Sequence, residues 1–303
     1  MTTAETTSNP TTQAPFGTVF TDTMAVVSGT AAGWGEPALV PVGPLSLHPG
    51  THALHYGSAC FEGLKAHRGA DGTVRIFRLE RHVERLLASA AVLHLPCPPA
   101  DVVTDVIVAL VADNLAAVPD APGSLYLRPT LFGTDPNIGA AASPSTSAQL
   151  VVLASPVGDY FAGGIRPLRL AVETGLPRTT PQFGMVKSGA NYAMALAPTL
   201  AARAALDVDQ VLFAPGGVVQ ETGAANILIL DGERLITPAL SEAFLHGVTR
   251  DSLLTIAAAD GYTIDERPAL TVDELLALAS RPGADAGTFR GAAGEEGPEI
   301  RQA

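Results

Sequence analysis

A lysine followed by small residues at the start of a helical pattern is the first candidate for chemistry. Lys187 lies in the stretch GMVKSGANY at 184–192, and Lys65 is the only other lysine in the chain. Small neighbours let a lysine amine approach a planar ring, and burial there lowers the pKa of the amine. Such an amine can form a Schiff base and carry a proton. Taken alone, however, a single loop lysine is more often an ordinary surface residue.

A second group of residues has the features of an anion site. The stretch LHGVTR at 245–250 comes directly before an apolar helical pattern. Backbone N–H groups at a helix N-terminus bind anions, and Thr249 adds a hydroxyl. Taken alone, simple N-capping of the helix by Thr249 is the more common explanation of this pattern. Arg85 stands on a predicted helix, off its apolar face, where an arginine is normally solvated.

The elements that must position these residues follow from apolar spacing and turn signals. Short apolar stretches separated by Gly, Pro and Asp-Gly predict strands and turns between residues 16 and 77. Asp231-Gly232 between two apolar stretches predicts a hairpin. Further strands are predicted at 125–132, 149–153, 168–172, 210–213 and 226–230, and helices at 79–95, 101–116, 190–205, 249–259 and 272–280.

This succession predicts a mixed α+β protein in two halves. The Pro- and Gly-rich segment 157–167 is the expected connection between an N-terminal α/β domain at 15–156 and a C-terminal domain at 168–280. Residues 1–14 are expected to form a disordered leader. Residues 281–303 have no apolar period and are expected to form a disordered tail without strands.

Composition limits the classes of partner. The 303 residues carry a net charge of −12, which argues against nucleic acids and anionic membranes, since both are bound by clustered Lys and Arg. Two cysteines, Cys60 and Cys97, are too few for a disulfide scaffold or a Cys-based zinc site. We therefore expect no metal site. The sequence shows neither a signal peptide nor an apolar run of about 20 residues, so the chain is expected in the cytoplasm.

Short sequence blocks follow one another along the chain in a recognisable order. They are FGTVFTD at 16–22, LHYG at 54–57, FEGLKA at 61–66, IFRL at 76–79, ERL at 84–86, LYLRPT at 125–130, KSGANY at 187–192, DQVLF at 209–213 and GVTRDS at 247–252. Together these blocks resemble the branched-chain aminotransferase family, and the resemblance runs from about Phe16 to about Leu278. It implies the fold-type-IV, D-amino-acid-aminotransferase-like architecture: two α/β domains with pyridoxal 5'-phosphate (PLP) between them, in a homodimer.

The resemblance also implies a role for each candidate residue. Lys187 is the catalytic lysine that carries PLP as a Schiff base, Glu221 faces the pyridine nitrogen and Tyr192 bonds the ring's phenolate oxygen. The phosphate is paired with Arg85 and held by the backbone of Gly247, Val248 and Thr249. The substrate side chain lies in an aromatic pocket, with an arginine at its edge for the γ-carboxylate of glutamate: Phe16, Tyr56, Phe61, Tyr126 and Arg128.

The implied reaction is transfer of the amino group from Leu, Ile or Val to 2-oxoglutarate. The sequence departs from the family at Ala224, where the family has Thr, and at the tail, where Gly287-Thr288 is all that resembles a small-residue turn before further strands. Two alternatives remain open. One is another fold-type-IV activity, D-amino-acid transamination or aminodeoxychorismate lysis. The other is a catalytically weak homologue that acts in binding or assembly.

Overall fold

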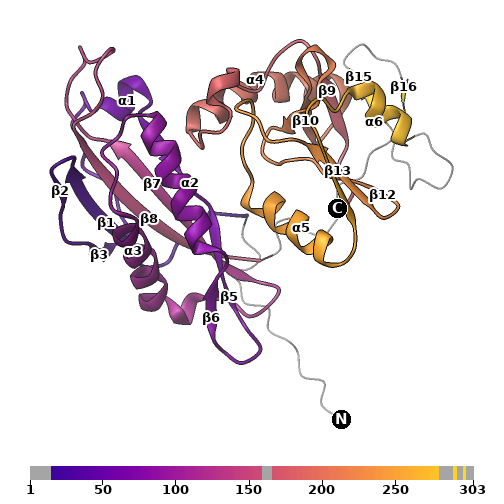
Figure 1. The fold of residues 1–303 in the computed structure, drawn as a ribbon. Helices are drawn as coiled ribbons and strands as arrows, with labels where there is room; N and C mark the ends of the chain where they lie inside the picture. Colours follow the sequence, from indigo (N-terminus) through magenta and orange to yellow (C-terminus); the bar gives the residue numbers. More distant parts are fainter. Residues whose placement is uncertain (1–14, 159–165, 280–288, 292–295, 298–303) are drawn as a thin grey trace. The chain divides into compact units, whose positions relative to one another are not determined.

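The computed structural model describes residues 15–158, 166–279, 289–291 and 296–297. The chain divides into two compact units, one up to Ile165 and one from Arg166 (Figure 1). The division falls inside the segment 157–167, which was expected to connect two domains. Most of that segment lies outside the described residues, and so does the expected leader at 1–14. Each unit is described by itself.

The first unit is built on an antiparallel eight-stranded sheet. Its strands follow the order β2-β1-β8-β7-β5-β6, while β3 pairs with β1 and β4 pairs with β7. The longest pairing, between β7 and β8, runs from Ser124 opposite Val157 to Gly133 opposite Ala148. The strands are β1 (Thr23–Thr30), β2 (Gly33–Trp34), β3 (Ala38–Pro41), β4 (Ala59–Phe61), β5 (Leu64–Arg68), β6 (Val74–Ile76), β7 (Ser124–Gly133) and β8 (Ser147–Val157).

Two helices cover one face of this sheet. They are α2 (Leu79–Val92) and α3 (Ala100–Asp113), which contact each other and the strands β1, β4 and β8 (Figure 1). The apolar spacing that predicted them faces the core, with Leu86 and Leu110 fully buried. A short helix, α1 (His52–Tyr56), and a 3-10 turn (Leu115–Ala117) complete the unit. The fold therefore fixes β4 and the buried face of α2 against each other.

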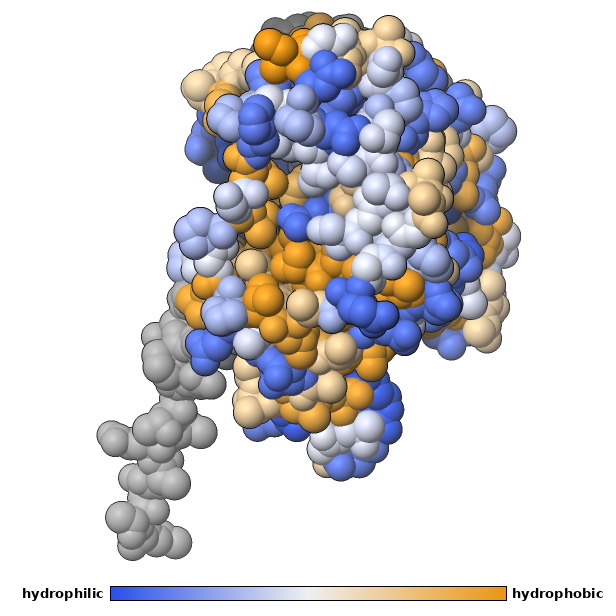
Figure 2. Space-filling view, turned by 90° about the vertical axis from the view of Figure 1, so that its left-hand side faces the viewer, coloured by the Kyte–Doolittle hydropathy of each residue, from blue (hydrophilic) through white to orange (hydrophobic). Residues whose placement is uncertain are grey.

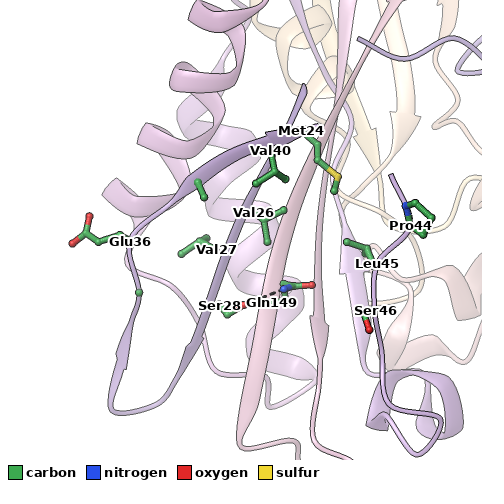
Figure 3. Close-up of a pocket in the computed structure, with 12 residues that line it drawn as sticks. Met24, Val26, Val27, Ser28, Glu36, Val40, Pro44, Leu45, Ser46 and Gln149 are labelled. Carbon is green, nitrogen blue, oxygen red and sulfur yellow. Dashed lines mark hydrogen bonds between the residues drawn. The ribbon is translucent and has the colours of Figure 1, made fainter. Parts of the chain in front are cut away.

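The other apolar cluster of the first unit contains Met24, Val26 and Val40, which line an open pocket of about 430 Å³ with Leu45 (Figure 3). Gln149 also lines this pocket, and it donates to the hydroxyl of Ser28, its partner on the neighbouring strand, at 3.0 Å (Figure 3). Apolar side chains also gather at the surface on the face of the molecule that Figure 2 shows. None of the residues singled out for chemistry lines the pocket.

The second unit contains two smaller sheets. One has the order β11-β10-β9-β15-β16 and the other β12-β13-β14. The strands are β9 (Leu170–Glu173), β10 (Gln210–Phe213), β11 (Glu221–Thr222), β12 (Ile229–Asp231), β13 (Arg234–Pro238), β14 (Thr263–Arg267), β15 (Phe289–Gly291) and β16 (Glu296–Gly297). The helices are α4 (Gly189–Leu206), α5 (Val248–Ala259) and α6 (Val272–Ala279), with 3-10 turns at Pro181–Phe183 and Pro215–Gly217.

The structure corrects two expectations in this unit. The strand predicted at 226–230 begins only at Ile229, although the hairpin around Gly232, with φ of 60°, is confirmed. The tail was expected to contain no strand, yet β15 pairs in parallel with β9, with Arg290 opposite Ala171. Pairing there covers an edge of β9 that would otherwise present unpaired backbone groups. The remaining tail residues, Gly287 and Thr288 among them, lie outside the described residues.

Candidate active site

Lys187 and Tyr192 lie together at the beginning of α4. Ser188 is the N-cap of the helix, and its hydroxyl accepts a hydrogen bond from the Ala190 amide. The half-buried Lys187 directly precedes this cap, and its Nζ donates to the Tyr192 hydroxyl at 2.9 Å. The same Nζ lies 5.5 Å from the centroid of the Tyr192 ring. The lysine amine is thus held beside a phenol at a helix N-terminus.

Asn191 holds the lysine loop in place. Its side chain is almost fully buried and donates to the carbonyls of Phe183, at 3.0 Å, and Val186, at 2.8 Å. Its Oδ1 accepts a hydrogen bond from the Thr179 hydroxyl at 2.6 Å. These bonds join the segment before Lys187 to the first turn of α4. Buried polar groups with every partner satisfied make a site rigid.

Gly184 brings the same loop close to a second segment. A Cβ at this position would lie 2.0 Å from the carbonyl carbon of Ala243 and 2.4 Å from the Phe244 nitrogen. Only glycine permits such an approach, because backbone atoms cannot move aside as a flexible side chain does. The backbone of Ala243 and Phe244 therefore packs directly on the lysine loop.

Glu221 is a buried carboxylate on β11, opposite Phe213 of β10, and it is 2% exposed. Its Oε1 accepts hydrogen bonds from Arg178 Nη1 at 2.7 Å and from the Leu245 amide at 3.2 Å. Its Oε2 accepts a longer one, at 3.3 Å, from Asn226 Nδ2. The carboxylate is therefore oriented by three donors from three different segments.

Burial raises the pKa of Glu221 to about 7, and the positive charges of Arg178 and Lys187 limit the rise. Taking a carboxylate out of water disfavours its charged form, whereas a nearby cation favours it. A buried acid that titrates near neutrality beside a lysine is typical of functional sites.

The N-terminus of α5 forms the next part of the site. Gly247 is the N-cap, and no side chain caps the helix there. A Cβ on Gly247 would lie 2.0 Å from Asn226 Oδ1, and Asn226 also donates to the Leu245 carbonyl at 2.8 Å. Val248 is buried and Thr249 is exposed. The first N–H groups of a helix have no partner within the helix, so this end offers donors and a partial positive charge to an anion.

Arg250, in the same block, is buried and serves the fold. Its Nη2 donates to the Pro238 carbonyl at 2.9 Å and to Glu266 at 2.6 Å. It thereby anchors α5 to β13 and β14.

Four of the five residues expected around the substrate form one cluster in the first unit. The rings of Phe16 and Tyr126 meet edge to face with centroids 4.8 Å apart. The Arg128 guanidinium lies 4.6 Å from the centroid of Phe61 and donates to the Tyr126 hydroxyl at 2.7 Å. A Cβ on Gly63 would lie 2.2 Å from the Tyr126 hydroxyl, so a larger residue at position 63 would displace that ring.

Tyr56 lies apart from this cluster. Its hydroxyl donates to the Ile138 carbonyl, and its ring contacts His52 and His55 of α1. Among the described residues, it shares no hydrogen bond or ring contact with the other four.

Arg85 has a different partner from the phosphate expected for it. Its Nε and Nη2 donate to the two oxygens of Glu62 at 2.6 and 2.8 Å, and His82 Nδ1 lies 2.8 Å from the same carboxylate. Glu62 is 1% exposed, and these hydrogen bonds lower its pKa to about 2 against the effect of burial. An unpaired carboxylate at this depth would be costly, so these two hydrogen bonds from Arg85 stabilise the fold. The phosphate contact of Arg85 stays a prediction.

Sequence reasoning did not single out Arg178, Asn191 or Asn226. Each is a polar side chain that contacts a functional group or the loop that carries it. Asn191 offered a signal, because a short amide in the first turn of an Ala-rich helix competes with the helix backbone unless it has a partner elsewhere. Arg178 and Asn226 lie in loops, where no periodicity marks a buried side chain.

Comparison with known proteins places the chain in a family. The model of the amino-transferase class IV family matches residues 59–280. The chain belongs to the class IV aminotransferases. It is 41% identical over 258 residues to a probable branched-chain-amino-acid aminotransferase of Streptomyces coelicolor, covering 83% of this chain and 70% of that protein. It is 39% identical over 270 residues to the branched-chain-amino-acid aminotransferase of Mycolicibacterium smegmatis, covering 86% and 72%.

Solved structures share the fold of this class IV aminotransferase. One is a branched-chain aminotransferase from the thermophilic archaeon Thermoproteus uzoniensis with norvaline, with a TM-score of 0.71 and 28% identity over 92% of this chain and 87% of that one. Another is a T.th. branched-chain amino acid aminotransferase with pyridoxamine 5'-phosphate, with a TM-score of 0.71 and 28% identity over 92% and 86%. The family resemblance and the fold class expected from the sequence are confirmed.

Two features are absent from the described residues. None of their helices combines the length and the apolar composition that crossing a membrane requires. The described part of this aminotransferase also holds no group of three or more His, Cys, Asp or Glu side chains placed to share a metal ion.

Proposed function

We propose that this class IV aminotransferase uses PLP to transfer the amino group of Leu, Ile and Val to 2-oxoglutarate. The observation that carries the proposal is the arrangement of Lys187, Tyr192 and Glu221 in the second unit, beside the N-terminus of α5. Relatives at 36–41% identity are named as branched-chain aminotransferases, which supports the substrate class.

The residues present fit PLP at each of its polar groups. Lys187 offers the amine for covalent attachment, and the Tyr192 hydroxyl, 2.9 Å from it, suits the ring oxygen beside that attachment point. Glu221 suits the pyridine nitrogen, and the amides of Gly247, Val248 and Thr249 suit the phosphate. When bound, PLP supplies an electron sink for the negative charge that develops at the substrate Cα.

The protein's own part in the reaction is to hold and move protons. Lys187 would carry the proton removed from Cα, and its hydrogen bond to Tyr192 holds the amine in place for that transfer. Glu221, which ionises near neutral pH, would in its charged form hold a proton on the pyridine nitrogen. The raised pKa of Glu221 makes this task sensitive to its neighbours.

We assign substrate recognition to the aromatic cluster of the first unit, together with Tyr56. The rings of Phe16, Phe61 and Tyr126 offer apolar surface to a branched side chain, where a few buried methyl groups contribute about 1–3 kcal/mol of selectivity. Arg128 receives the γ-carboxylate of glutamate or 2-oxoglutarate. Structures of the T.th. enzyme with 4-methylvaleric acid and with N-(5'-phosphopyridoxyl)-L-glutamate support a site that accepts both kinds of side chain. The proposed assembly is a homodimer.

The absorbance spectrum of the PLP-loaded protein tests the proposal. We expect a band at roughly 410–430 nm that L-leucine bleaches. Lys187→Ala should abolish the band, while Lys65→Ala, which changes the only other lysine, should keep it. A band that only D-amino acids bleach would overturn the substrate class. No band at all would overturn the proposed function.

A further inference from the structure

Arg178 contacts both side chains assigned to the PLP ring. It is 2% exposed, in the loop between β9 and the turn at Pro181–Phe183. Its Nη1 donates to Glu221 Oε1 at 2.7 Å, and its Nε donates to the Gly223 carbonyl at 3.1 Å. Its guanidinium carbon lies 5.2 Å from the centroid of the Tyr192 ring. A single buried cation therefore lies against the acid and the phenol together.

The donors to Glu221 are unevenly divided between its two oxygens. Oε1 accepts from both Arg178 and the Leu245 amide, which satisfies its two lone pairs. Oε2 accepts only the 3.3 Å bond from Asn226 among the described residues. The carboxylate is thus held by one oxygen, while the other retains capacity to accept a short hydrogen bond.

The charge of Arg178 also favours the ionised form of this carboxylate. Burial alone favours the protonated acid, and the groups that oppose it are the cations of Arg178 and Lys187 and the donors of Leu245 and Asn226. With all of them present, the pKa of Glu221 is about 7. Removing the nearest cation raises that pKa further, so the acid is protonated at neutral pH and no longer stabilises a positive ring nitrogen.

We infer that Arg178 is a positioning residue for PLP: it fixes the Glu221 carboxylate through Oε1 and leaves Oε2 to the pyridine nitrogen. Arg178 acts through Glu221. The inference rests on the proposed function, because the ring nitrogen belongs to the proposed cofactor.

A double-mutant cycle on PLP affinity tests this role. The variants are Arg178→Met, Glu221→Gln and the two combined, each titrated as the apo protein with PLP and followed by absorbance. Arg178→Met should weaken PLP binding by roughly 30-fold, about 2 kcal/mol. In the Glu221→Gln background the same change should have little further effect, because the group it acts through is gone. Arg169→Met, which changes an exposed arginine of the same unit, is the matched control.

The pH dependence of PLP affinity gives a second readout. In the wild type, affinity should rise as Glu221 ionises near pH 7, and in Arg178→Met the midpoint should move upward by about one unit or more. Glu221→Gln should lack this transition. Arg178→Lys, which keeps the charge with fewer donors, should fall between the wild type and Arg178→Met. If Arg178→Met does not fold, Arg178→Lys takes its place in the cycle.

The outcomes separate this inference from the function on which it rests. Equal, additive losses in both backgrounds, or an Arg178 variant that behaves like Arg169→Met, would overturn the positioning role while PLP binding stands. A wild-type protein that does not bind PLP would overturn the proposed function itself.

Discussion

Replacing Arg85 by Met distinguishes a structural arginine from a phosphate ligand. Its guanidinium makes two hydrogen bonds to Glu62, a carboxylate that is 1% exposed, and is itself mostly buried. Breaking a buried ion pair from one side leaves an uncompensated charge and typically costs about 3–5 kcal/mol. The folded environment lowers the pKa of Glu62 from 4.5 to about 2, which corresponds to about 3 kcal/mol of free energy in favour of the ionised carboxylate.

The assay is urea unfolding of the apo protein. At pH 7 we expect Arg85→Met to lose about 3–5 kcal/mol of unfolding free energy. Arg81→Met removes an exposed pair with Glu84 on the same helix and should cost no more than about 0.5 kcal/mol. Adding Glu62→Gln to Arg85→Met should recover part of the loss, since no buried charge then remains unpaired.

The stabilisation by this pair has a definite pH window. Because the folded pKa of Glu62 lies below its unfolded value, the contribution is complete above about pH 4.5 and is lost as the pH falls toward 2. Arg85→Met should therefore lose stability less steeply than the wild type over that range. An Arg85→Met protein with unchanged apo stability and weaker PLP binding would refute this reasoning and support the predicted phosphate contact of Arg85 instead.

Three further predictions follow from the site. Gly247→Ala should weaken PLP binding and cost about 1–3 kcal/mol of unfolding free energy, because the added Cβ meets Asn226. Gly189→Ala should be tolerated, because the space around Gly189 is open. PLP titration and urea unfolding of both variants check this prediction. The folded pKa of Glu221 is raised, so the unfolding free energy of the apo protein should fall by up to about 3 kcal/mol as the pH rises from 4.5 to 7. Glu221→Gln should remove this dependence of the unfolding free energy on pH. An unchanged dependence in the variant would contradict the burial argument. Arg128→Met should raise the KM for 2-oxoglutarate by about 10- to 100-fold and change the leucine half-reaction little. Steady-state kinetics in which the variant affects 2-oxoglutarate and leucine equally would contradict the role assigned to Arg128.

The sequence predicted the elements with strong periodicity well. Helices α2 and α3 follow from apolar side chains that all face one core, and α4 begins within one residue of its predicted start. The family resemblance supplied Lys187, Tyr192 and Glu221. Neither the resemblance nor the sequence pattern predicted the contacts of Arg178 and Arg85, because a buried ion pair joins segments far apart in sequence and leaves no local pattern. The strands β15 and β16 were missed for a related reason, since the backbone pairing of β15 with β9, and of β16 with β15, needs no apolar side chains.

The most direct test of the central claim is to find which residue PLP modifies. The PLP-loaded protein is reduced with borohydride, digested and analysed by mass spectrometry. We expect the phosphopyridoxyl group on the peptide that contains Lys187, and its loss when the protein is treated with L-leucine before reduction. A label on Lys65, or no label in protein that binds PLP, would contradict the account.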